Sequence, residues 1–180
     1  MFHLSCIYLA IAPLALNKCR RLTRVNIRNE LRDWANKIEW DVKVTLTFAD
    51  DLTPARAHKT VRRFWNRVDC ELYGNAARRF NKRCQRLLFL EGSEDGTRYH
   101  YHGVAKTPAD RFPNVEDYCQ FLRKQWREEC PYNRIVEFEP PQEPKGWVRY
   151  ITKSVEKGNC DTFDVAASHI AVTDLLNEHD

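Results

Sequence analysis

The segment CQRLLFLEGSEDGTRYHYHGVAK, residues 84–106, decides the fold because it specifies a β-hairpin in the middle of the chain. Asp95 and Gly96 form a strong two-residue turn signal, since a type I′ turn requires positive φ at both central positions and these residues tolerate it. The flanking segments then pair as strands, 84–93 with 97–106, and the turn fixes their register.

This register predicts a group of metal ligands on one face of the hairpin. Glu91 falls directly opposite His100, and His102 follows two residues later on the same face. The Cβ atoms of directly opposed residues lie about 5 Å apart across such a pair. Two imidazoles and a carboxylate with open coordination positions suit Mn²⁺ or Mg²⁺, although imidazoles also accept Zn²⁺. The alternative is a pair of ordinary histidines that are hydrogen-bonded to their neighbours.

A second element carries a tyrosine and positive charge. The stretch WVRYITKSVEK, residues 147–157, reads as a helix that starts after Pro144 and Gly146 and stops at Gly158. Residues three and four apart share one flank of a helix. The flank with a phenol and two ammonium groups consists of Tyr150, Lys153, Ser154 and Lys157. A tyrosine in an amphipathic helix that only packs in the core is the alternative.

Together these motifs resemble those of the HUH endonucleases. The run His100-Tyr101-His102 is followed by Tyr150-Ile151-Thr152-Lys153 in a Tyr-x-x-Lys pattern, as in the single-tyrosine initiators of rolling-circle replication in plasmids and single-stranded DNA viruses or phages. Thr45-Leu46-Thr47-Phe48 is similar to the first motif of the family. The resemblance covers about residues 40–158. The alternatives are an HUH transposase, which shares the same cleavage chemistry, and a non-catalytic module of the same sheet type that only binds single-stranded nucleic acid.

The resemblance implies a nicking and joining reaction on single-stranded DNA. A phenol is a poor nucleophile at neutral pH, so Tyr150 needs the positive charge of Lys153 and of a divalent cation. His100 and His102 would hold the cation, with Glu91, Glu94 or Glu137 as the carboxylate. The product would be a 5′-phosphotyrosine and a 3′-OH that primes synthesis. Tyr118 and Tyr132 are the next candidates for the nucleophile.

Length and charge restrict the partners. A chain of 180 residues with 43% hydrophobic content fits one compact domain without room for a helicase, so a host helicase and polymerase would be needed at the single-stranded origin. One tyrosine on the helix suggests that a second protomer, in a homo-oligomer on DNA, completes the reaction. A basic block suited to phosphate contacts, or alternatively to a solvated helix face, comprises Arg56, Lys59, Arg62, Arg63, Arg67, Arg78, Arg79, Lys82, Arg83 and Arg86.

Cysteine usage and hydropathy indicate an intracellular protein. The seven cysteines are odd in number and form no CxxC pair, which favours a reducing, cytoplasmic location. The apolar stretch 4–16 contains Pro13 and is shorter than a membrane span requires. We therefore expect no membrane association.

The element pattern predicts an α+β fold. Strands 41–48 and 97–106 should be central in a ferredoxin-like or RRM-like antiparallel sheet with helices on both faces. The predicted order β-α-β-β-α-β-α follows an N-terminal helix at 21–38 and uses 41–48, 53–73, 84–93, 97–106, 114–129, 133–139 and 145–157. We expect an N-terminal arm and helix at 1–39, the nuclease domain at 40–158 and a helical tail at 159–180.

The alternation also predicts the two faces of the sheet. Helices 53–73 and 114–129 should cover the apolar face. The opposite face should carry the polar side chains of Thr45, Thr47, Glu91, His100 and His102. Helix 145–157 would then lie over this polar face, with Tyr150 pointing at the metal.

Overall fold

The computed structural model describes residues 24–92, 98–131, 135–156 and 162–170. Their elements are α2 (Arg24–Ala35), β1 (Val42–Leu46), α3 (Pro54–Tyr73), α4 (Asn75–Phe80), β2 (Arg86–Glu91), β3 (His100–Ala105), α5 (Val115–Glu129), β4 (Val136–Glu139), α6 (Pro144–Ile151) and α7 (Lys153–Glu156). The strands form one antiparallel sheet in the order β2-β3-β1-β4. The predicted α+β class and the central position of β1 and β3 are confirmed.

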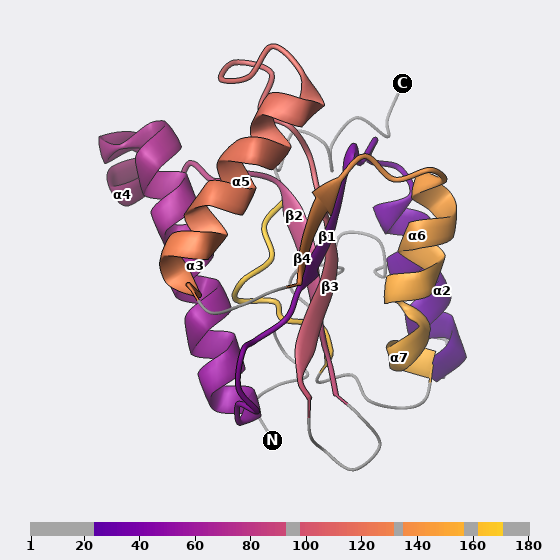
Figure 1. Ribbon diagram of the computed structural model, residues 1–180. Coiled ribbons are helices and arrows are strands. Elements are labelled where there is room, and N and C mark those ends of the chain that lie inside the picture. The colour runs from indigo at the N-terminus through magenta and orange to yellow at the C-terminus, as the bar shows by residue number, and fades with distance from the viewer. Residues whose placement is uncertain (1–23, 93–97, 132–134, 157–161, 171–180) are drawn as a thin grey trace, which may run out of the picture.

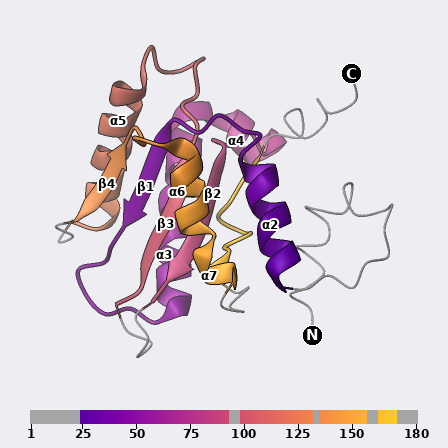
Figure 2. The same cartoon turned by 90° about the vertical axis from the view of Figure 1, so that its right-hand side faces the viewer.

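Helices cover both faces of this sheet. Helices α3 and α5 lie on one face, and α2, α6 and α7 lie on the other (Figure 1). Viewed from the second side, α6 runs across the front of the strands and α2 lies beside it (Figure 2). The molecule therefore has three layers, with the sheet in the middle.

The two cores follow from the period-2 alternation of the strands. In β1, Val42, Val44 and Leu46 are fully buried toward α3 and α5, while Lys43 and Thr45 face α6. The first core is completed by large side chains that include Leu88, Tyr101, Phe64, Trp65, Leu122 and Trp126. The second core, under α2 and α6, contains Leu31, Leu87, Phe89, Val104, Val148 and Ile151.

Local signals fix the helix ends. Thr53 caps α3 by accepting a hydrogen bond from the Arg56 backbone N–H at 3.4 Å, and a proline follows it at the first helical position. Gly74, with φ of 52°, ends the helix. Asn114 caps α5 by accepting a hydrogen bond from the Asp117 backbone N–H at 2.9 Å.

Helix α4 was not predicted. It starts immediately after Gly74 and ends at Phe80. Asn81 follows as the C-cap, with a left-handed φ of 53° that asparagine tolerates. Gly74 therefore separates the two helices α3 and α4.

The predicted helix 145–157 is interrupted. Helix α6 ends at Ile151, and α7 starts again at Lys153. The Thr152 hydroxyl donates to the backbone carbonyls of Val148 and Arg149 at 2.9 and 3.2 Å, a bond that competes with the regular helical ladder. Tyr150 and Lys153 nevertheless remain on the same flank, because the interruption is a single residue.

The C-terminal segment differs from the predicted helical tail. Residues 162–170, the described part of that tail, form isolated bridges with β2 at Phe89↔Phe163 and Arg86↔His169. The Arg86 and His169 backbones exchange hydrogen bonds of 2.7 and 2.9 Å. The segment thus covers the outer edge of β2, which would otherwise expose unpaired backbone groups.

Within the described part of the chain, no helix combines the length and the apolar character that crossing a membrane requires.

Candidate metal and tyrosine site

The hairpin brings the predicted metal ligands together. Glu91 pairs with His100 in the β2–β3 ladder, which confirms the predicted register, and the turn residues 93–97 with Glu94 lie outside the described residues. One ligand atom from each of Glu91, His100 and His102 lies within 4.8 Å of the other two. Two imidazoles and one carboxylate at this spacing fit a divalent cation with open coordination positions.

Hydrogen bonds orient both imidazoles. Nδ1 of His100 lies 3.1 Å from the backbone carbonyl of Arg98 and therefore acts as the donor, which leaves Nε2 as the free ligand atom. Nδ1 of His102 lies 3.3 Å from Oγ1 of Thr45, the residue opposite it on β1. Partners of this kind fix the ring plane of a metal-ligating histidine.

His102 is held in its neutral form. Only 8% of the residue is exposed, and burial lowers its pKa to about 4, with the neighbouring His100 acting in the same direction. The two rings are 4.8 Å apart between centroids. At neutral pH the lone pair of His102 is consequently available to a cation without first losing a proton.

Lys153 links the ligand group to the tyrosine helix. Its ammonium nitrogen lies 3.3 Å from Oε2 of Glu91, and the same carboxylate oxygen is 3.9 Å from Nε2 of His100. Partial burial lowers the pKa of Lys153, but Tyr150 and Glu91 outweigh that effect, so its pKa is raised overall. Lys153 is thus a cation at neutral pH.

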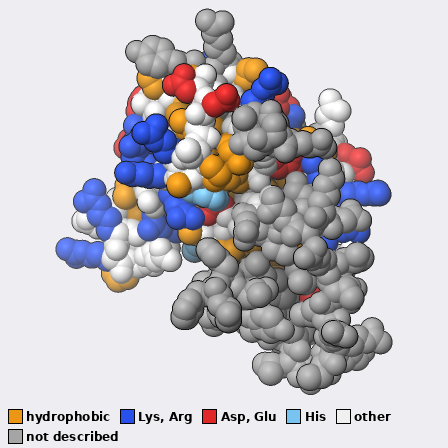
Figure 3. All heavy atoms as spheres, turned by 90° about the horizontal axis from the view of Figure 1, so that it is seen from below, with side chains coloured by type: hydrophobic (Ala, Val, Ile, Leu, Met, Phe, Trp, Pro, Cys, Tyr) orange, Lys and Arg blue, Asp and Glu red, His pale blue; other side chains and the backbone are white. Residues whose placement is uncertain are grey.

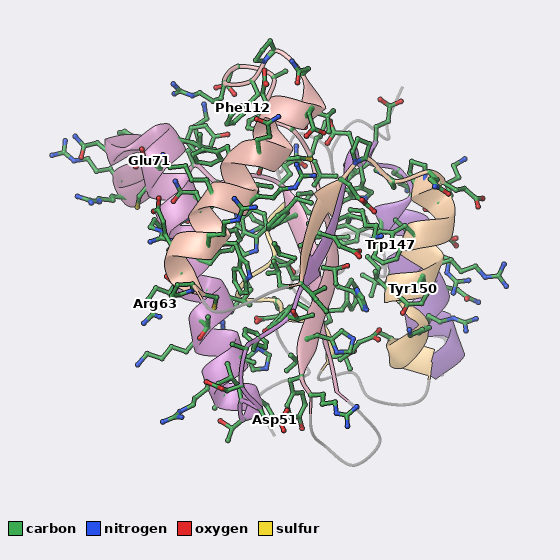
Figure 4. All side chains as sticks on the ribbon, viewed as in Figure 1. Asp51, Arg63, Glu71, Phe112, Trp147 and Tyr150 are labelled. Atoms are coloured by element: carbon green, nitrogen blue, oxygen red, sulfur yellow. The ribbon has the colours of Figure 1, made fainter. Side chains whose placement is uncertain are left out.

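Tyr150 projects toward the ligands from α6. Its ring centroid is 5.2 Å from that of His102, and Nζ of Lys153 is 3.5 Å from the tyrosine ring centroid. Figure 4 shows Trp147 and Tyr150 on the side of α6 that faces the sheet. Tyr150 is 41% exposed, so its side chain is accessible from solvent.

Trp147 completes the site; its place one helical turn before Tyr150 predicts either stacking on an unpaired base or packing in the core. Its ring stacks on Tyr150 at 4.9 Å and 17°, and it meets the His102 ring at 90° and 5.4 Å. Its indole N–H donates to the backbone carbonyl of Gly103 at 2.8 Å. The signal in the sequence is its position three residues before Tyr150, one helical turn away.

The other predicted candidates lie elsewhere. Glu137 is opposite Thr45 but pairs with Lys43 at 2.9 Å, and this ion pair lowers its pKa. Tyr118 is fully buried in the first core, on the opposite side of the sheet from His102. Tyr132 lies outside the described residues.

The basic block divides into internal and exposed cations. Arg86 is only 4% exposed and pairs with buried Asp69 at 3.0 Å, so it serves the core and not a DNA surface. Ion pairs within the molecule also engage Arg62, Arg63, Arg67, Lys82 and Arg83. The exposed cations of the block that have no ion pair among the described residues are Arg56, Lys59, Arg78 and Arg79. Seen from below, Lys and Arg side chains gather on the side where α3 and α4 lie (Figure 3).

Comparison of the chain with protein-family models, with curated proteins and with solved structures found no match.

Proposed function

We propose that this protein is a metal-dependent endonuclease and strand transferase that nicks single-stranded DNA at a replication origin and so initiates rolling-circle replication. The observation that carries the proposal is the convergence of an exposed phenol, Tyr150, with an ammonium group and with the Glu91, His100 and His102 ligand set. The ligands come from a hairpin and the phenol from a helix far away in the sequence.

The fold supports the same class. In the order β2-β3-β1-β4, strand β3 lies between β1 and β2, so α3 connects two non-adjacent strands. We infer a ferredoxin-like arrangement, which is built on such a split β-α-β unit. The motif resemblance to the HUH endonucleases implies this sheet with the ligands on one face and the tyrosine helix above it.

The chain's residues suffice to describe the transfer. The hydroxyl oxygen of Tyr150 attacks the scissile phosphorus, the bond from phosphorus to the 3′-oxygen breaks, and the DNA 5′-phosphate becomes esterified to the tyrosine. The phenolic proton ends on the departing 3′-oxygen, so no net water or oxidant is consumed. Lys153 places a positive charge beside the Tyr150 ring, where it would stabilise the negative charge that develops during the transfer.

The metal ligands would add charge stabilisation. A cation held by Glu91, His100 and His102 would stabilise negative charge on the phosphate, which is worth several kcal/mol in such sites. Mn²⁺ or Mg²⁺ fits this role, because the site combines a hard carboxylate oxygen with imidazole nitrogens. The neutral state of His102 keeps the ligand set ready at neutral pH.

The reaction is reversible because the phosphotyrosine conserves the energy of the broken bond. The free 3′-OH primes synthesis. A 3′-OH at the end of another DNA strand can later attack the phosphotyrosine, which rejoins the DNA and releases the tyrosine. The helix carries one tyrosine near the ligands, which suggests that a second protomer contributes to termination. Strand separation and synthesis would fall to a host helicase and polymerase.

The decisive experiment is a covalent-adduct assay. The purified chain is incubated with Mn²⁺ and end-labelled single-stranded oligonucleotides with a randomised centre, and the products are separated on a denaturing gel. Wild type and the control variant Tyr73→Phe, on α3, should form a protein–DNA adduct, whereas Tyr150→Phe should not. His102→Ala should bind DNA without cleaving it. An adduct that persists in Tyr150→Phe or in EDTA contradicts the proposal.

A further inference from the structure

A cavity of about 350 Å³ opens beside Trp147, where the end of β4 leads into α6. Its walls include Lys43, Glu139, Pro140, Pro141, Glu143 and Trp147. The volume lies within the range of small-ligand pockets, which is about 300–1,000 Å³. The metal ligands are not part of its lining, so it is a separate compartment.

The cavity adjoins the proposed nucleophile through a single side chain. Trp147 lines the cavity and also stacks on Tyr150 at 4.9 Å between ring centroids. The Gly103 carbonyl fixes the indole by accepting its N–H at 2.8 Å. A strand with a phosphate at Tyr150 would therefore have a neighbouring nucleotide at the mouth of the cavity.

The walls of the cavity suit a flat, uncharged ring. Pro140, Pro141 and the indole provide apolar surface, and the polar wall consists of Lys43, Gln142 and the carboxylates of Glu139 and Glu143. Nζ of Lys43 lies 4.9 Å from the centroid of the Trp147 ring. Lys43 is the cation among these walls, and Glu137 and Glu139 hold it at 2.9 and 2.8 Å, which raises its pKa although burial acts in the opposite direction. The negative charges of Glu139 and Glu143 exceed the single positive charge of Lys43, which is already ion-paired. The cavity therefore repels a phosphate.

We propose that this cavity binds one unpaired nucleobase of the single-stranded DNA substrate and selects bases that carry an exocyclic amine. The proposal rests on the proposed function for the identity of the substrate. An amine offers two hydrogens to the wall that contains Glu139 and Glu143, and a carboxylate that accepts from the cytosine amine is a known mode of base readout. The 4-carbonyl of thymine or uracil would instead face the carboxylates with its own lone pairs.

The test compares two probes that differ mainly at this position. Fluorescein-labelled 12-mers of deoxycytidine and of deoxyuridine are titrated with the full chain at neutral pH in EDTA, and binding is followed by fluorescence anisotropy. Wild type should bind the deoxycytidine probe about tenfold more tightly, the discrimination expected of one good base contact. The double variant Glu139→Ala/Glu143→Ala should reduce this ratio to near one.

A matched control separates base readout from net charge. Glu71→Ala/Glu128→Ala also removes two carboxylates, from exposed positions on α3 and α5, and should keep the tenfold ratio. Equal affinity of wild type for both probes, absence of binding, or an unchanged ratio in the cavity variant would overturn the inference. If the protein prefers the deoxycytidine probe but forms no Tyr150 adduct, the nicking activity is refuted and base binding in the cavity stands. If it forms the adduct but shows no base preference, base binding in the cavity is refuted and the nicking activity stands.

Discussion

Replacing Asp164 with Asn should lower the free energy of unfolding by about 2–4 kcal/mol. Asp164 is only 2% exposed and accepts hydrogen bonds through both carboxylate oxygens. Oδ2 lies 2.7 Å from the Tyr101 hydroxyl and 2.7 Å from Nδ1 of His58, and Oδ1 lies 3.0 Å from Nη2 of Arg62 and 3.1 Å from the Ala167 backbone nitrogen.

Two estimates give the magnitude. Although burial opposes ionisation of Asp164, its hydrogen bonds lower the carboxyl pKa from 3.8 to about 2, which corresponds to roughly 2 kcal/mol at 1.36 kcal/mol per pKa unit. Removing one member of a buried ion pair costs about 3–5 kcal/mol, and the amide of Asn retains part of the hydrogen bonding. The ion pair between half-exposed Arg62 and Asp164 contributes less to the free energy of unfolding than its 3.0 Å distance suggests, because solvent screens the arginine.

The same carboxylate predicts the direction of the pH dependence. A carboxyl whose pKa is lower in the folded state stabilises the protein above its unfolded pKa of about 3.8. That stability is lost as the pH falls toward 2. Wild type should therefore lose stability over this interval more steeply than Asp164→Asn, so that the two proteins converge in acid.

Urea denaturation at pH 7 and between pH 4 and 2 measures both effects. The control is Asp110→Asn, which removes an exposed carboxylate paired with Lys82 at 3.0 Å and should cost less than about 1 kcal/mol. A surface substitution typically changes the free energy of unfolding by no more than about 0.5 kcal/mol. If the free energy of unfolding of Asp164→Asn lies within that amount of the wild-type value, the assignment of Asp164 as a buried anchor is refuted.

Two further substitutions, each with a matched control, test the packing of β3 and the hydrogen bond to His102. Gly103→Ala should lower the free energy of unfolding in urea by more than about 2 kcal/mol, because its Cβ would lie 2.4 Å from the Leu87 carbonyl oxygen. Gly74→Ala should lower it by less, because the space around Gly74 is open and only its positive φ is strained. Thr45→Val should weaken Mn²⁺ binding about tenfold in calorimetric titration, because His102 loses its hydroxyl partner. Thr47→Val, whose hydroxyl bonds the Ile135 carbonyl instead, should bind Mn²⁺ as wild type does.

The hairpin and its ligand face could be predicted because they depend on local rules. Strand alternation has a period of two, and the Asp95-Gly96 turn signal in the sequence predicted which residue of β2 opposes His100. The caps at Thr53 and Asn114 were equally predictable, since a cap depends on residues within one turn of it. These local rules place Glu91, His100 and His102 on one face without knowledge of the rest of the chain.

The errors concern pairings between residues far apart in the sequence. Arg86 belonged to the predicted basic block, but its guanidinium meets Asp69 across the first core, 17 residues away. Asp164 lies 63 residues from Tyr101, and composition gives no sign that the segment 162–170 covers the edge of β2. The interruption at Thr152 was missed for a different reason, because a threonine side chain can either face solvent or bond back to its own helix.

The geometry of the ligand set is determined partly from the opposite face of the sheet. Tyr101 lies between His100 and His102 in β3, so its side chain points into the first core while theirs point toward α6. The Tyr101 hydroxyl contacts both Asp164 and His58. Burial raises the pKa of Tyr101 above its ordinary value, so the hydroxyl keeps its proton and donates a hydrogen bond to the Asp164 carboxylate. Because both faces belong to one strand, this anchor helps to hold the β3 backbone that carries the two imidazoles. Helix α6 is attached to the same strand by the hydrogen bond from the Trp147 indole to the Gly103 carbonyl, so β3 positions both the ligand set and the proposed nucleophile, Tyr150.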